Sequence, residues 1–226
     1  MVRIGSGGRV LVGLGMALSF FICAQAGAAE QLAGRVLFVS GPAKIVGAAG
    51  GERTMARGDE IRVGDLLVTR EDTLGQIKLG DGSLLALRPG SALKVESYGE
   101  TRPQGISAVL ILARGAVRVI NQGVVIGGTQ AALVVKTPSA SIRLVNADGD
   151  AFVIAAHPGG REDPDAGTYS RVLAGAGSIQ TDRGNLWLER GAVGFAADGE
   201  TPPSSLAGLP HKLLSAIAST GRVGAP

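Results

Sequence analysis

The sequence predicts an all-β protein, a single domain of short antiparallel strands joined by glycine-rich turns. Short apolar or alternating runs follow one another from Gly34 to Phe195, and turn residues separate them roughly every 8–12 residues. This spacing is too short for βαβ units, and no helical periodicity occurs before Pro203. Hydrophobic residues make up 45% of the 226 residues, enough to build a core. A two-sheet sandwich, a jelly roll and a β-helix-like winding all fit this pattern.

The first 28 residues are predicted to be a secretory signal peptide. Arg3 and Arg9 precede or flank an uncharged apolar run, and small residues follow it, so we expect cleavage after Ala26 or Ala28. An uncleaved anchor helix is the alternative, because residues 10–29 match the ~20 residues that span a bilayer. Cys23 is the only cysteine and lies in this segment, so we expect no disulfide in the exported chain.

The clearest strands lie in residues 75–95. Ile77 and Leu79 alternate there with polar residues, and Asp81-Gly82 and Pro89-Gly90 supply two turns. This stretch predicts three strands and two turns. The other predicted strands cover residues 36–39, 61–63, 66–69, 109–112, 116–120, 124–126, 133–137, 142–145, 152–155, 169–173, 177–181, 186–188 and 193–195.

Two polar segments interrupt or follow this β-domain, which we assign to residues 34–197. Residues 156–167 are rich in proline, glycine and charge and predict a surface loop. Residues 198–226 predict a linker and a short helical tail, with the helix at residues 209–219 and Leu213, Leu214 and Ile217 on one side.

Charge and motifs exclude several function classes. The 22 basic and 19 acidic residues are mixed without a Lys/Arg run, so we expect no nucleic-acid partner. No nucleotide-binding glycine motif occurs, and we expect no cofactor. His157 and His211 are the only histidines, too few for a zinc site without thiolates, and we expect no metal.

The carboxylates do not point to catalysis. Asp59, Asp65 and Asp81 each lie beside a glycine, where a turn role is favoured over a carboxylate pair for glycoside hydrolysis. The acids at residues 162, 163 and 165 are expected to form a solvated loop tip instead of a calcium site. We therefore predict no catalytic residues, and a hydrolase with two converging carboxylates ranks third among the hypotheses.

The candidate binding surface consists of Tyr169, Trp187, His157 and Arg161. The first two are aromatic residues on predicted strands, where an exposed ring serves as a platform for sugars or peptides, although core packing is the favoured interpretation of both. The other two lie in the polar loop of residues 156–167.

An ordered series of short glycine-containing motifs runs through residues 34–98. These motifs are Gly34-Arg35-Val36, Arg57-Gly58-Asp59, Val63-Gly64-Asp65-Leu66-Leu67, Gly75-Gln76-Ile77-Lys78-Leu79, Asp81-Gly82-Ser83 and Pro89-Gly90-Ser91. The series continues to about residue 197 through Leu112-Ala113-Arg114-Gly115, Lys136-Thr137-Pro138 and Gly177-Ser178-Ile179. In this order the motifs resemble the FecR domain of Gram-negative periplasmic proteins. One departure is that Ile142 to Asp150 stand where the family has an Arg-Gly-Thr segment.

The resemblance implies a non-enzymatic exported module that binds a protein or takes part in signalling or regulation. We expect a periplasmic location, an envelope or outer-membrane protein as partner, and contact with the membrane only through the N-terminal segment if it is uncleaved. Only nine residues precede the apolar run, so we expect no cytoplasmic sigma-factor-regulating segment. The alternative is a carbohydrate-binding or cell-wall-binding β-module, in which Trp187 and Tyr169 would both be exposed.

Overall fold

The computed structural model of the protein describes residues 31–101, 106–123, 125–126, 129–156 and 163–220. These residues form strands and one short helix, which confirms the all-β prediction. In chain order the elements are β1 (Leu32–Ser40), β2 (Ala43–Val46), β3 (Glu52–Thr54), β4 (Glu60–Arg62), β5 (Leu66–Thr69), β6 (Leu74–Leu79), β7 (Leu84–Leu87), β8 (Ala92–Thr101), β9 (Ile106–Ile120), β10 (Val125–Ile126), β11 (Thr129–Gln130), β12 (Ala132–Lys136), β13 (Ser141–Ile154), β14 (Gly167–Thr181), β15 (Gly184–Leu188), β16 (Val193–Ala196), β17 (Ser204–Leu206) and α1 (His211–Thr220).

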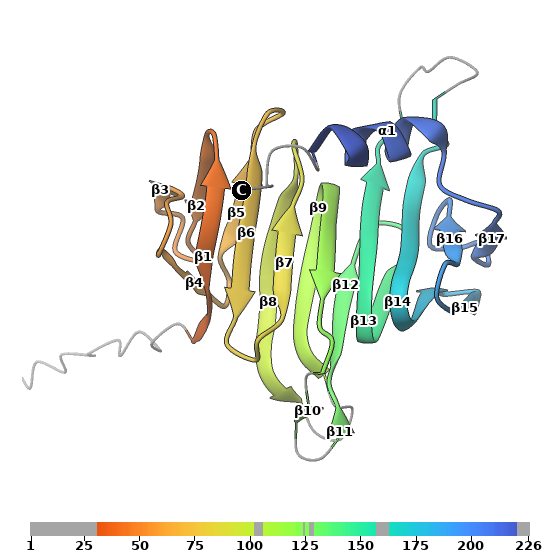
Figure 1. Ribbon diagram of the computed structural model, residues 1–226, viewed down its shortest axis with the longest axis horizontal. Coiled ribbons are helices and arrows are strands. Elements are labelled where there is room, and N and C mark those ends of the chain that lie inside the picture. Colours follow the sequence, from red (N-terminus) through yellow and green to blue (C-terminus); the bar gives the residue numbers. More distant parts are fainter. Residues whose placement is uncertain (1–30, 102–105, 124, 127–128, 157–162, 221–226) are drawn as a thin grey trace, which may run out of the picture.

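One continuous 15-stranded sheet folds over on itself into two facing layers (Figure 1). The layer that we call sheet A has the order β4-β1-β6-β7-β9-β13-β14-β16-β17. Sheet B has the order β3-β2-β5-β8-β9-β12-β13-β14-β15. The strands β10 and β11 pair separately as a small hairpin.

Three long strands belong to both layers, because each turns a corner between them. The corners lie at Gly115 in β9, Asn146 in β13 and Gly175 in β14, where φ is +80°, +46° and +75°. A Cβ at Gly175 would lie 2.0 Å from the Asn146 carbonyl oxygen, so only glycine fits there. The sequence predicted two short strands in place of each of these three. The turn residues that suggested separate strands are instead corners within continuous ones.

The pairing of β9 with β12 is parallel, unlike the expectation of antiparallel strands throughout. The corner in β9 is the cause. The strand turns back on itself, and Asn121, just after its end, donates a hydrogen bond to the Ala131 carbonyl, just before β12. The chain thus re-enters sheet B beside the start of β9 and runs in the same direction, with Ala132 opposite Ile106.

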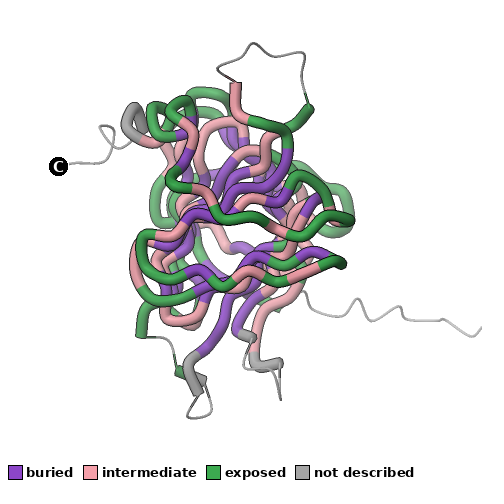
Figure 2. The backbone as a smooth tube through the Cα atoms, turned by 90° about the vertical axis from the view of Figure 1, so that its right-hand side faces the viewer, coloured by how far each residue is buried: buried purple, intermediate pink, exposed green. Residues whose placement is uncertain are grey.

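Apolar side chains from both layers pack into one core. Along β6, Ile77 and Leu79 are buried while Gln76 and Lys78 are exposed, as the alternation of a half-buried strand requires. Sheet B contributes Leu110 and Leu133 to the same cluster. Figure 2 shows the buried residues gathered inside, with exposed residues at the turns.

A second apolar cluster lies on the outer side of sheet A beneath α1, near the upper ends of β13 and β14 in Figure 1. Leu209 and Leu213 pack there on Phe152, Tyr169 and Val193. The predicted helix at residues 209–219 is confirmed, and the structure shows that it docks. Part of the predicted linker forms β17, which pairs with β16.

None of the helices in the described part of the chain is long and apolar enough to cross a membrane. The predicted signal peptide, residues 1–28, lies outside the described residues.

We expect Tyr169→Phe to lower the free energy of unfolding by about 1 kcal/mol, because the Tyr169 hydroxyl donates a 3.0 Å hydrogen bond to the Asp165 carbonyl. Burial, and then the charge of Asp165, raise the pKa of Tyr169 above 10.0. As the pH rises, the Tyr169 phenol therefore ionises in the unfolded chain before it ionises in the folded chain. The stability that the neutral phenol contributes below pH 10.0 is lost as the pH rises through the pKa of the folded state. Urea unfolding between about pH 8 and pH 11 should show a steeper loss for the wild type than for Tyr169→Phe. Parallel curves would contradict this.

Candidate functional site

The acidic residues singled out in the sequence serve turns, as predicted. Asp59 accepts a hydrogen bond from the Ala56 amide, Asp65 from the Arg62 amide and Asp81 from the Ser83 amide, at 2.8–2.9 Å. Within the described ranges, no group of three histidine, cysteine or acidic side chains is placed to hold a metal ion.

Of the four residues of the candidate binding surface, the structure describes two, Tyr169 and Trp187. Tyr169 is 2% exposed and its ring packs on Phe195, with centroids 4.6 Å apart, so the favoured interpretation of this ring as a core residue is confirmed and the ring does not belong to a binding surface. Trp187 is 70% exposed, so the favoured interpretation of this ring as a core residue is wrong. His157 and Arg161 lie outside the described residues.

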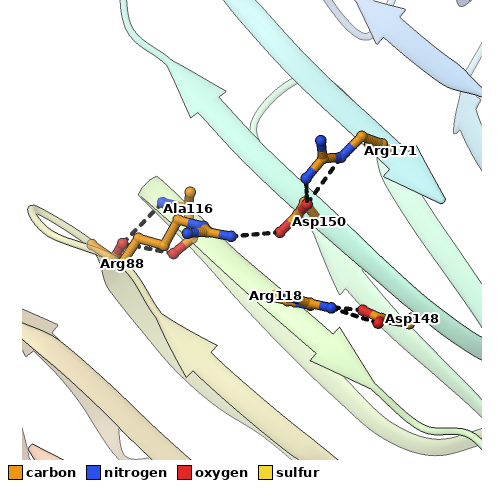
Figure 3. Close-up of polar contacts among 7 residues, drawn as sticks. Arg88, Ala116, Arg118, Asp148, Asp150 and Arg171 are labelled. Carbon is orange, nitrogen blue, oxygen red and sulfur yellow. Dashed lines mark hydrogen bonds and ion pairs between the residues drawn. The ribbon is translucent and has the colours of Figure 1, made fainter. Parts of the chain in front are cut away.

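A charged cluster that the sequence did not reveal lies on the outer side of sheet A (Figure 3). Asp150 is fully buried and binds two arginines. Its Oδ1 accepts a hydrogen bond from Arg88 Nη2 at 2.9 Å, and its Oδ2 accepts bonds from Arg171 Nε and Nη2 at 3.1 and 2.5 Å. The three side chains come from the end of β7, from β13 and from β14, so they tie together strands separated by β9.

A second ion pair lies beside this cluster. Arg118 on β9 donates from Nε and Nη2 to the two oxygens of Asp148 on β13, at 2.8 and 2.6 Å. This bidentate hydrogen bonding raises the pKa of the Arg118 guanidinium, which stays charged. No sequence signal identified Asp148 and Asp150 as sheet residues, because Asp-Gly-Asp is typical of a turn.

The basic face, as we call it, is the part of the outer side of sheet A over β1, β6, β7 and β9. In one row across these strands Arg35, Lys78, Leu84 and Ile120 are neighbours, and in the next Phe38, Gln76, Ala86 and Arg118. Phe38 is 40% and Leu84 37% exposed.

The tryptophan face, on the outer side of sheet B, carries the exposed ring of Trp187 on its outermost strand. Trp187 pairs with Ser178, and Ser178 with Arg143. The next row is polar throughout and consists of Asn185, Gln180, Ser141 and Lys136. A pocket of about 360 Å³ borders this row. Its lining includes Lys136, Ser139, Ser141, Gln180, Asp182 and Gly199.

No family model and no curated protein matches the chain. The FecR-domain resemblance therefore stays a prediction. Two crystal structures of "a putative anti-sigma factor" from Parabacteroides distasonis ATCC 8503, at 2.50 and 1.65 Å resolution, are similar to it, with 12% and 13% identity and a TM-score of 0.47 each. They cover 67% of this chain, which spans 63% and 64% of theirs. A likeness at this level says nothing about what this chain binds.

Proposed function

We propose that the protein is a non-enzymatic binding module of the cell envelope that docks an acidic partner protein on its basic face. The observation that carries this proposal is an excess of positive charge on the outer side of sheet A. Along the described strands of that side, counting Arg88 just after β7, six basic side chains accompany three acidic ones. The basic residues are Arg35, Arg62, Lys78, Arg88, Arg118 and Arg171, and the acidic residues are Glu60, Asp148 and Asp150.

The acids of this side are already engaged. Glu60 binds both Arg35 and Arg62, at 2.7 and 2.6 Å, and Asp150 binds two arginines. Asp148 is likewise paired with Arg118. Lys78 forms no ion pair with another described residue and is exposed. A partner with carboxylates opposite Lys78 and its cross-strand neighbour Arg35, which shares Glu60 with a second arginine, would balance the excess charge, and such balance favours rapid and specific association.

Apolar side chains lie among these charges. Leu84 is the cross-strand neighbour of Lys78, and Phe38 lies in the next row, beside Gln76. Helix α1 packs on another part of sheet A, where its cluster includes Ala116 at the upper end of β9, Phe152 and Tyr169, and no element of the described residues packs on the outer side of β1, β6 and β7. Interfaces between proteins commonly combine such an apolar centre with a charged rim.

The proposed location is the periplasm. The basic N-terminus followed by an apolar run and small residues supports export, and the absence of cysteine after Cys23 leaves the folded domain indifferent to an oxidising compartment.

A pull-down from periplasmic extract, quantified by mass spectrometry, tests the proposal. We expect an acidic protein that is captured by the wild type and reduced about tenfold by Lys78→Glu, because two units of charge change at the centre of the contact. Leu84→Ala should also weaken capture, and salt at about 0.5 M should release the partner.

The matched control is Arg190→Glu, which makes the same charge change at an exposed turn after β15. Capture by this variant should equal that of the wild type. A partner held equally by wild type and Lys78→Glu, or one lost equally with Arg190→Glu, would refute the basic face as the docking site.

A further inference from the structure

The tryptophan face lies on the opposite side of the molecule from the basic face and carries a different chemistry. Leu186 and Leu188 of β15 face the core, so the intervening Trp187 and the preceding Asn185 face outward. The indole ring is thus presented on a sheet surface, at its outermost strand, with polar side chains beside it.

The polar row next to Trp187 spans four adjacent strands. Asn185, Gln180, Ser141 and Lys136 are cross-strand neighbours, so their side chains follow one another at the spacing of neighbouring strands, about 4.8 Å. The side-chain amides of Asn185 and Gln180 form no hydrogen bond to another described residue. Both amides therefore have their donors and acceptors available to a ligand.

An open pocket borders this row, and Gln180, Ser141 and Lys136 line it together with turn residues. Its volume of about 360 Å³ lies within the range of small-molecule sites. Lys136, Asp182 and the hydroxyl groups of Ser139 and Ser141 give it charges of both signs as well as groups that donate and accept. Pro138 and Ala140 add small apolar surfaces, so the pocket is suited to a ligand that combines hydrogen-bonding groups with C–H groups.

We propose that the tryptophan face binds a saccharide, with one sugar ring stacked on Trp187 and the hydroxyl and amide groups of the chain bound along Asn185, Gln180 and the pocket. A sugar ring has an apolar face of C–H groups that packs on an indole ring, and an edge of hydroxyls that both donate and accept. The indole ring of Trp187 matches the C–H face of the sugar, and the neighbouring side-chain amides of Asn185 and Gln180 match its hydroxyl edge. Lys136 on the same face favours a saccharide that carries carboxylates.

This site does not depend on the proposed function, because the two faces lie on the outer sides of different layers. If the exposed ring had no polar neighbours, the face would suit a protein partner as well as a saccharide. The row of available amides next to the ring favours the saccharide.

Trp187 is the only tryptophan of the chain, so its fluorescence reports on this face alone. We expect a saturable change in emission when the protein is titrated with soluble peptidoglycan glycan fragments from which the stem peptides have been removed, so that the carboxylates of muramic acid are free. In a second titration the ligand is a neutral N-acetylglucosamine oligomer, which carries no carboxylate. Weaker binding in that titration indicates recognition of the carboxylate, while equal binding locates the affinity in the stacked ring and amides.

Gln180→Ala and Asn185→Ala should each weaken binding about tenfold, and isothermal titration calorimetry should detect no binding to Trp187→Ala. Gln122→Ala, a matched change at an exposed turn, should bind like the wild type. Far-UV circular dichroism checks that the variants are folded. No change in emission up to about 10 mM of either saccharide, a Kd weaker than most specific recognition, would overturn the proposal. Binding that Gln180→Ala and Asn185→Ala leave unchanged would do the same.

Discussion

Replacing Asp150 by asparagine is expected to lower the free energy of unfolding by about 3 to 5 kcal/mol. The carboxylate is fully buried, and it is the shared partner of Arg88 and Arg171, whose side chains are only 13% and 18% exposed. The substitution leaves two guanidinium groups beside a neutral amide with little water around them. Urea unfolding followed by circular dichroism measures the change.

Two further variants separate charge from packing. Asp148→Asn removes a carboxylate whose partner Arg118 is 38% exposed, so water replaces part of the lost interaction and the expected cost is about 1 kcal/mol. Combining Asp150→Leu with Arg88→Met and Arg171→Met replaces the whole cluster by apolar groups and should recover most of the stability. If Asp150→Asn cost no more than Asp148→Asn, the cluster would not stabilise the sheet.

Gly175→Ala is expected to cost about 3 to 5 kcal/mol or to prevent folding. The residue has φ of +75°, which costs an alanine about 1 to 2 kcal/mol by itself. The new methyl group would also lie 2.0 Å from the Asn146 carbonyl oxygen and 2.7 Å from the Ala147 Cα, both of them backbone atoms that cannot rotate away. The corners of β13 and β14 would have to move apart.

Gly191→Ala is the matched control for this substitution. Gly191 has a similar φ of +88°, but no atom lies within 4 Å of the position of its Cβ. It should therefore show the backbone cost alone, about 1 to 2 kcal/mol. Equal losses for the two variants would mean that the close approach of the two corners does not constrain the fold.

Much of the fold could be predicted from the sequence, because period-two alternation and turn chemistry are local signals. The β6–β7 hairpin follows from the alternation around Ile77 and from Asp81-Gly82. The corners could not be predicted in this way. Gly115 and Gly175 look like ordinary turn residues, and only tertiary packing shows that the strand continues through them.

Less of the candidate site than of the fold could be predicted from the sequence. The exposure of Trp187 depends on which side of β15 faces the core, which the register of β14 against β15 decides. Tyr169, in contrast to Trp187, is buried, because α1 covers its side of sheet A. This helix lies more than forty residues further along the chain, so a local pattern around Tyr169 does not report it. The clustering of Arg88, Asp150 and Arg171 needs strands distant in sequence to become neighbours, and no local pattern reports that.

The strands that turn from one layer into the other have a mechanical consequence. In a sandwich whose layers are joined only by loops, the two layers can slide past each other or separate without loss of strand pairing. Here β9, β13 and β14 run through both layers, so separating the layers means breaking backbone hydrogen bonds between paired strands. A load applied to one outer surface is therefore borne by the same chains that form the other.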